Sequence, residues 1–239
     1  MSELNIEFAE ISLADIEAKA QKLIEDYEDH AGKRVRTPVP VESIAEHYLG
    51  YTIDITNEGL FSDPHYLGGI VFDENIIRVN ASVENHEGRY NFTIAHEIGH
   101  HMLHREQFLA SRDAETPNIM CRENKAKPLV ERQADQFASA LLMPREQVSR
   151  AVEKLHIPTG EITAKALRVM ASQVIKSGGF TNVSNTAMAN RLITLGFARG
   201  VDFQTGRSID MLRSTDARGY SKTDRWLYKK IKTVFTFIR

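Results

Sequence analysis

The sequence predicts an α+β protein, in which a first domain with a small sheet and several helices is followed by a small helical module. Three observations indicate this class: apolar residues recur at helical spacing in several separate segments, short strand-like segments lie between them, and the pattern changes near residue 161. With 239 residues, the chain is long enough for one sizeable core and a second module. We expect a first domain at 1–155, a helical module at 156–198 and a basic C-terminal segment at 199–239.

A first helix is predicted to begin after Ser12, a residue type that caps helix N-termini well. The apolar residues of one face follow at helical spacing: Ile16, Ala20, Leu23, Ile24 and Tyr27. The prolines of Thr37-Pro-Val-Pro40 interrupt the helical pattern. A shorter helix then runs to Gly50, where a glycine favours its end.

Strand-like segments come next. Residues 51–55 alternate between apolar and polar side chains, and the apolar segments 70–72 and 76–79 flank a short polar turn. The second and third segments therefore predict a hairpin. Two interpretations stay open: the hairpin is buried in the core, or one of its strands is an exposed edge to which an extended substrate adds.

Two long helices are predicted in the middle of the chain, at 87–104 and 131–143. The residues between them, 105–128, are polar and include two prolines, so we expect a long loop there. Pro144 ends the second helix and is a residue type that can start the next one.

Two further helices follow residue 161 and are separated by Gly178 and Gly179. Ser184 is the predicted cap of the second helix and Gly196 its end. The pair can form a helix-turn-helix, but Asn185, Asn190 and Arg191 are few polar residues for a DNA-reading face. A helical hairpin that packs on the first domain or docks a substrate is therefore the favoured interpretation.

The basic segment near the C-terminus has interleaved aromatic residues and is open to two interpretations. It can hold a nucleic-acid backbone, or its Trp226, Leu227, Ile231 and Phe235 can pack on the protein at helical spacing. The second is favoured.

The run His96-Glu97-Ile98-Gly99-His100 is the most informative motif and lies on the predicted helix 87–104. Two histidines four residues apart on a helix project from one face, so both imidazoles can bind one metal ion. Glu97 is too far round the helix to be a comfortable third ligand, but it can contact a metal-bound water. This arrangement is the one that metal-assisted hydrolysis of a peptide bond requires.

A zinc site of this kind needs a third protein ligand. A histidine six residues after the second is excluded, because Glu106 stands there. Glu131 on the second long helix is the candidate, and Asp135, one turn later, can accept the other ring N–H of a ligating histidine. Alternatively, these two carboxylates form a solvated acidic face, and His104 is then the fallback ligand.

These two blocks resemble the ImmA/IrrE family of zinc metallopeptidases. The second block is Glu131-x-x-Ala134-Asp135-x-Phe137-Ala138-x-x-Leu141-Leu142-Met143-Pro144, and the lead-in Phe92-Thr93-x-Ala95 and the Pro-Val-Pro-Val segment at 38–41 are similar too. The resemblance covers roughly residues 12–145. It implies a zincin-like fold, one Zn²⁺ held by His96, His100 and Glu131, and Glu97 as the catalytic base. Because the family's studied members cleave repressors of the helix-turn-helix type, it also implies that substrate class.

In hydrolysis by such a site, Glu97 accepts a proton from the attacking water and then donates it to the leaving amine. A second electrophile often helps to polarise the carbonyl; the candidates are His65, Tyr66 and Tyr90. His101 lies off the ligand face. Cys121 precedes the second block and is interpreted either as an ordinary loop residue or as a thiolate that blocks the metal.

Composition narrows the class of protein. A net charge of −2 indicates no particular partner, and a single cysteine excludes an internal disulfide. The acidic N-terminus has no apolar core of a signal peptide, and no apolar run reaches the length of a membrane span. We therefore expect a cytoplasmic protein without membrane contact.

The leading functional hypothesis is a zinc-dependent regulatory endopeptidase whose partner is a helix-turn-helix repressor. The alternatives are a DNA-binding regulator with a structural or vestigial zinc site, and a scaffold that only binds protein. Nucleic acid is a less favoured partner, and the sequence predicts no oligomeric state.

Overall fold

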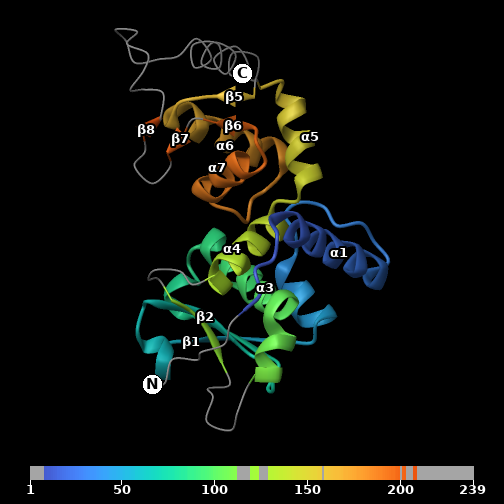
Figure 1. Ribbon diagram of the computed structural model, residues 1–239, viewed down its shortest axis with the longest axis vertical. Coiled ribbons are helices and arrows are strands. Elements are labelled where there is room, and N and C mark those ends of the chain that lie inside the picture. The colour runs from blue at the N-terminus through green and yellow to red at the C-terminus, as the bar shows by residue number, and fades with distance from the viewer. Residues whose placement is uncertain are drawn as a thin grey trace. The chain divides into compact units, whose positions relative to one another are not determined.

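A computed structural model describes residues 8–111, 119–123, 129–157, 159–199, 201–202 and 207–208 (Figure 1). The chain divides into two compact units, Met1–Pro144 and Arg145–Arg239. This division by packing falls before the predicted boundary at residue 155, so α5 (Arg145–Leu155) groups with the second unit. The functional assignment of 1–155, 156–198 and 199–239 stays a prediction.

The first unit begins with α1 (Leu13–Ala31), whose predicted N-cap is confirmed. The Ser12 hydroxyl accepts a hydrogen bond from the Asp15 backbone N–H at 3.1 Å, and Gly32 ends the helix with a left-handed φ of 62°. The five predicted apolar residues are all buried. The shorter predicted helix is also present, as α2 (Val41–Ser43) and a π-helical turn, η1 (Ile44–Tyr48).

A four-stranded sheet forms one layer of this unit, in the order β1-β3-β2-β4. Its strands are β1 (Thr52–Thr56), β2 (Tyr66–Val71), β3 (Ile76–Asn80) and β4 (Met120–Glu123). The predicted hairpin is confirmed, because β2 and β3 pair antiparallel with Ile70 opposite Ile77. Since β3 also pairs with β1, and β2 with β4, neither strand is an exposed edge. The edge interpretation was therefore wrong, and the hairpin belongs to the core.

Short 3₁₀ turns join these strands to the rest of the unit: η2 (Gly59–Ser62) lies before β2 and η3 (Ala81–Val83) follows β3. Asn80 fixes this region, because its buried side-chain amide donates to the carbonyls of Phe61 and Tyr66. The segments that enter and leave the hairpin are thereby tied together.

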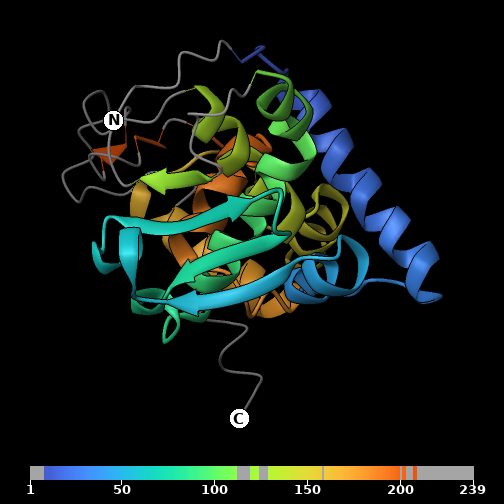
Figure 2. The ribbon, with the colours of Figure 1, turned by 90° about the horizontal axis from the view of Figure 1, so that it is seen from below.

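The helix α3 (Glu87–Ser111) packs on β2 and β3, α4 (Leu129–Leu142) packs on α3, and α1 packs on α4 (Figure 2). The predicted loop at 105–128 was partly wrong. Within it, α3 continues to Ser111, because the buried Phe108 ring lies 5.4 Å from the Phe72 ring. In addition, β4 forms by pairing with β2.

The second unit contains α5, α6 (Ala164–Gly178) and α7 (Asn185–Thr194), with α6 packed on both other helices. Two short strand pairs complete it: β5 (Gly160–Glu161) with β6 (Ala198–Arg199), and β7 (Val201–Asp202) with β8 (Arg207–Ser208). The predicted cap of α7 is confirmed, since the Ser184 hydroxyl accepts from the Ala187 N–H. Its predicted terminator, Gly196, has a φ of 80°.

The side chains of α7 bear on the helix-turn-helix interpretation. Arg191 is 1% exposed, and the Asn185 side chain donates to the Arg168 carbonyl of α6. The exposed residues of α7 are then Thr186, Asn190 and Thr194, which carry no positive charge. The helix-turn-helix module therefore stays a prediction, and the basic segment that follows lies almost entirely outside the described residues.

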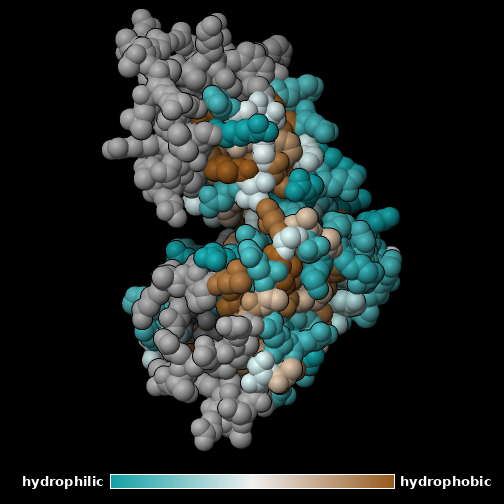
Figure 3. All heavy atoms as spheres, in the orientation of Figure 1, coloured by the Kyte–Doolittle hydropathy of each residue, from teal (hydrophilic) through white to brown (hydrophobic). Residues whose placement is uncertain are grey.

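On the face drawn in Figure 3, the surface of the described residues mixes hydrophilic and hydrophobic side chains. Its exposed large hydrophobic residues, Leu13, Ile55 and Leu60, belong to three different elements and are less than 40% exposed. Within the part of the chain that the structure describes, no helix has both the length and the apolar character needed to cross a bilayer.

Candidate metal centre

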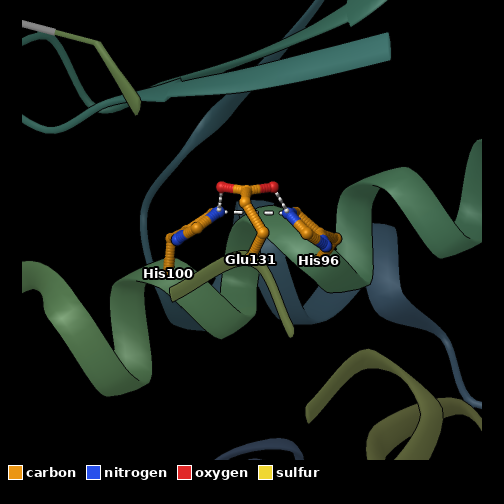
Figure 4. A group of neighbouring side chains, drawn as sticks. All are labelled: His96, His100 and Glu131. Atoms are coloured by element: carbon orange, nitrogen blue, oxygen red, sulfur yellow. Dashed lines mark hydrogen bonds and ion pairs between the residues drawn. The ribbon is translucent and has the colours of Figure 1, made fainter. Parts of the chain in front are cut away.

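Two helices place a compact group of side chains that could hold a metal ion at their interface. His96 and His100 come from consecutive turns of α3, and Glu131 comes from the first turn of α4 (Figure 4). The two Nε2 atoms lie 3.0 Å apart, and each lies 3.2 Å from one oxygen of the Glu131 carboxylate. The histidines are fully buried and Glu131 is 7% exposed. The structure thus brings together the three residues that the sequence predicted as ligands.

Asp135 lies where the sequence predicted it, behind the first of these histidines. Its Oδ1 is 2.9 Å from Nδ1 of His96. A carboxylate only accepts, so Nδ1 of His96 carries the hydrogen and donates it. The lone pair of this imidazole is then on Nε2, the atom that faces Glu131 and His100.

The electrostatics of the group favour a neutral His100 ring and an ionised Glu131 carboxylate. Burial opposes the ionisation of Glu131, but its interactions with His100 and His96 outweigh burial and hold the pKa of its carboxyl below the usual value. Burial lowers the pKa of His100. A deprotonated carboxylate and unprotonated imidazoles are the forms that bind a metal.

This donor set fits a divalent cation. Tetrahedral ligands at about 2.0–2.1 Å from Zn²⁺ stand roughly 3.3 Å apart, close to the observed separations of 3.0–3.2 Å. The three candidate ligand atoms all lie within 4.8 Å of one another. Three protein ligands are typical of catalytic zinc sites, whereas structural zinc sites usually have four.

Glu97 follows the first candidate ligand, His96, on α3 and is fully buried. The strand β2 lies close to the Glu97 carboxylate at Gly68, where the absence of a side chain leaves room for this approach. A Cβ at position 68 would lie 2.9 Å from Oε1 of Glu97 and 2.4 Å from Cγ2 of Thr93. Gly68 therefore permits the close approach of sheet and site helix that encloses the Glu97 carboxylate.

Gly99 lies between the two candidate histidine ligands and faces α4. A Cβ there would lie 3.1 Å from the Ala134 carbonyl oxygen and 3.3 Å from Cβ of Phe137. The two helices are consequently packed nearly backbone to backbone at the site. This close packing brings Glu131 of α4 within reach of the imidazoles of α3.

His104, the fallback ligand, lies behind the second histidine. Its Nδ1 is 3.1 Å from Nδ1 of His100, and its Nε2 is 3.0 Å from Oε1 of Gln133. The Gln133 amide donates in turn to the Ala9 carbonyl at 3.1 Å, and the Phe8 ring lies edge-on to His104. The spacing of four residues from His100 to His104 was a signal for this contact, whereas nothing in the sequence pointed to Gln133.

The candidates for a second electrophile have different surroundings. The Tyr90 hydroxyl donates to Glu42 at 2.7 Å, and burial, together with this bond, raises the pKa of Tyr90. His65 is exposed and pairs with Asp63. Tyr66 begins β2 and is half-buried. None of these observations selects one of the three for the reaction.

Two other residues singled out in the sequence also have defined places. His101 lies off the ligand group as expected, since its Nδ1 is 2.8 Å from the Tyr51 hydroxyl, and burial lowers the pKa of its ring to about 4. Cys121 pairs with Gly69 through the backbone of β4, but its side chain is outside the described residues.

Comparison with known proteins identifies the kind of domain in which this centre lies. A model of the Peptidase_M78 family, described as the IrrE N-terminal-like domain, matches residues 35–175. The match contains all of α3 and α4 and thus every residue of the candidate metal centre. No curated protein matches the chain.

Proposed function

Because the chain belongs to the ImmA/IrrE family of metallopeptidases, the Peptidase_M78 family, we propose that it is a zinc-dependent endopeptidase that cleaves a helix-turn-helix repressor. The observation that carries the proposal is the convergence of two imidazoles and one carboxylate in a buried group, with a further buried glutamate next to the first histidine. The substrate class is supported by the resemblance to the family's studied members.

One Zn²⁺ held by His96, His100 and Glu131 would supply a water of lowered pKa and would polarise the scissile carbonyl. Glu97 accepts the proton of the attacking water and delivers it to the leaving amine. A buried carboxylate suits this work, because proton transfer within an enclosed site does not compete with bulk solvent. Asp135 holds the His96 ring in the orientation in which Nε2 faces the metal.

Glu97→Gln tests the proposed base. The variant keeps the shape of the side chain and all three ligands, so we expect it to bind one zinc with an affinity within about 3-fold of the wild type. Cleavage of a purified helix-turn-helix repressor should fall by about 10²- to 10⁴-fold, the usual contribution of a general base. The measurements are zinc affinity by competition with a chromophoric chelator and cleavage followed on gels.

Glu106→Gln is the matched control, because Glu106 is an exposed glutamate of the same helix. It should cleave as the wild type does. Equal cleavage by Glu97→Gln would remove the assignment of the base. A wild-type chain that binds zinc but cleaves neither that repressor nor a related one would favour the alternative, a regulator that binds DNA or protein and uses zinc structurally.

A further inference from the structure

The hydrogen bonds behind His100 form a chain that leads away from the metal centre to the N-terminal segment. From His100 the chain passes to His104, then to Gln133 on α4, and ends at the Ala9 carbonyl. His104 and Gln133 are each 1% exposed, so water does not compete for these bonds. The general base does not use this chain, and Ala9 lies outside the family match at 35–175.

The direction of every bond in the chain follows from its far end. The Ala9 carbonyl can only accept, so the amide nitrogen of Gln133 faces it and Oε1 of Gln133 faces His104. This oxygen only accepts, so Nε2 of His104 carries a hydrogen. Because His104 is a buried ring and the neutral form has one N–H, its Nδ1 bears the lone pair.

The last bond then determines the tautomer of the metal ligand. Two Nδ1 atoms 3.1 Å apart need one donor and one acceptor, and His104 is the acceptor. Nδ1 of His100 therefore carries the hydrogen, and the lone pair is on Nε2, which faces His96 and Glu131.

We propose that His104 and Gln133 are positioning residues for the metal ligand His100, fixing the ring and tautomer in which Nε2 binds the cation. The inference rests on the metal binding in the proposed function and deepens it. It gives the two histidine ligands different partners: an anionic carboxylate, Asp135, behind His96, and a neutral imidazole behind His100. The neutral partner orients its ligand without adding charge to a group that already contains Glu131 and Asp135.

The tautomer of His104 is measured directly on the full-length, zinc-loaded protein with ¹⁵N-labelled histidine. The two-bond nitrogen–hydrogen correlations should show the His104 hydrogen on Nε2, and the spectrum of His104→Leu assigns the signals. A hydrogen on Nδ1 of His104 would place two donors face to face and would overturn the proposal. Gln133→Leu has no acceptor for the His104 hydrogen, so we expect the Nε2–H tautomer of His104 to be less populated in this variant. An unchanged His104 tautomer would show that Gln133 does not determine it.

Zinc affinity provides the second measurement, by competition with a chromophoric chelator. His104→Leu should bind zinc about 10- to 100-fold more weakly than the wild type, the usual effect of losing the partner of a ligating histidine. His104→Asn retains an oxygen near the Nδ1 position and should stay within about 3-fold. His101→Leu makes the same replacement off the ligand face and should leave the affinity unchanged. Circular dichroism of each metal-free variant confirms that it is folded.

Equal affinity of His104→Leu and the wild type would refute the positioning role, and so would a His104→Asn variant as weak as His104→Leu. Neither result would contradict the proposed peptidase function, since both concern only the residues that position one ligand. A wild-type chain that binds no zinc would instead refute the proposed function, and this inference with it.

Discussion

Replacing Gly68 with alanine is expected to push the sheet and the site helix apart. The new methyl group would lie 2.4 Å from Cγ2 of Thr93, whereas two carbon atoms pack at about 3.5 Å or more. Thr93 is fully buried and β-branched, so its side chain has few rotamers into which to withdraw. The overlap of about 1 Å must be relieved by the backbone of β2 or α3, and overpacking of this kind costs about 1–3 kcal/mol of unfolding free energy.

The same methyl group would lie 2.9 Å from Oε1 of Glu97, so the proposed base must move as well. A displacement of about 1 Å at a reacting group can cost about 10²-fold in rate. We therefore expect cleavage by Gly68→Ala to fall by about 10- to 100-fold. Zinc affinity should change by less than about 3-fold, because Gly99 and its contacts keep α3 and α4 together at the ligand group.

The assay combines guanidinium unfolding, repressor cleavage and zinc competition on the same preparations. Ile70→Val is the control, since it loosens the fully buried core of the same strand by about 0.5–1.5 kcal/mol and adds no atom near Glu97. A Gly68→Ala protein as stable and as active as the wild type would refute the reasoning. A loss of cleavage just as large in Ile70→Val would show that general loosening of the sheet, and not displacement of Glu97, is responsible.

Three further changes have defined outcomes. Asp135→Asn should weaken zinc binding by about 10- to 100-fold in the competition assay, because the His96 ring loses its anionic partner. Chelation should lower the unfolding free energy, by about 2.7 kcal/mol if free zinc had stood at about 100 times its dissociation constant, and the thermal midpoint with it; an unchanged midpoint would contradict zinc binding. Glu28 accepts from the Val35 N–H at 2.8 Å and from Arg34, which lowers the pKa of its carboxyl. Its stabilisation is therefore fully present above the ordinary glutamate pKa near 4.5 and is lost as the pH falls through the lowered value. In urea titrations, Glu28→Gln should cost about 1–2 kcal/mol of unfolding free energy at pH 7 and progressively less as the pH is lowered below 4.5.

Elements whose signals are local could be predicted from the sequence. Ser12 and Ser184 cap the helices they were expected to cap, and the hairpin of β2 and β3 follows from two apolar segments around a polar turn. The strand β4 could not be predicted, because its four residues become a strand only by pairing with β2, which lies some fifty residues earlier. The last turns of α3 depend in the same way on contact between Phe108 and Phe72.

In the candidate site too, features with local sequence signals could be predicted, whereas features that depend on contacts between distant segments could not. His96 and His100 share a helix face, so their meeting follows from their spacing, and Glu131 and Asp135 share a face of the next helix. The role of Gln133 could not be predicted, because it lies on a different face of α4 from Glu131. Its contact with His104 depends on how closely α3 and α4 pack, and its contact with Ala9 on where the N-terminal segment runs. Such properties belong to the assembled fold.

Because Gly99 has no side chain, α3 and α4 pack closely, and coordination of a metal ion depends directly on the distance between these two helices. The side chain of any larger residue there would clash with the carbonyl of Ala134. The clash would displace α4, with the Glu131 carboxylate, away from the two imidazoles on α3. The hydrogen bonds that Asp135 and Gln133 make to histidines of α3 span the same helix interface, so widening it would break both of them together with the two contacts of Glu131. Ion binding should therefore stabilise the packing of α3 against α4. Loss of the ion should weaken the contacts along the whole interface between these helices rather than those of one residue.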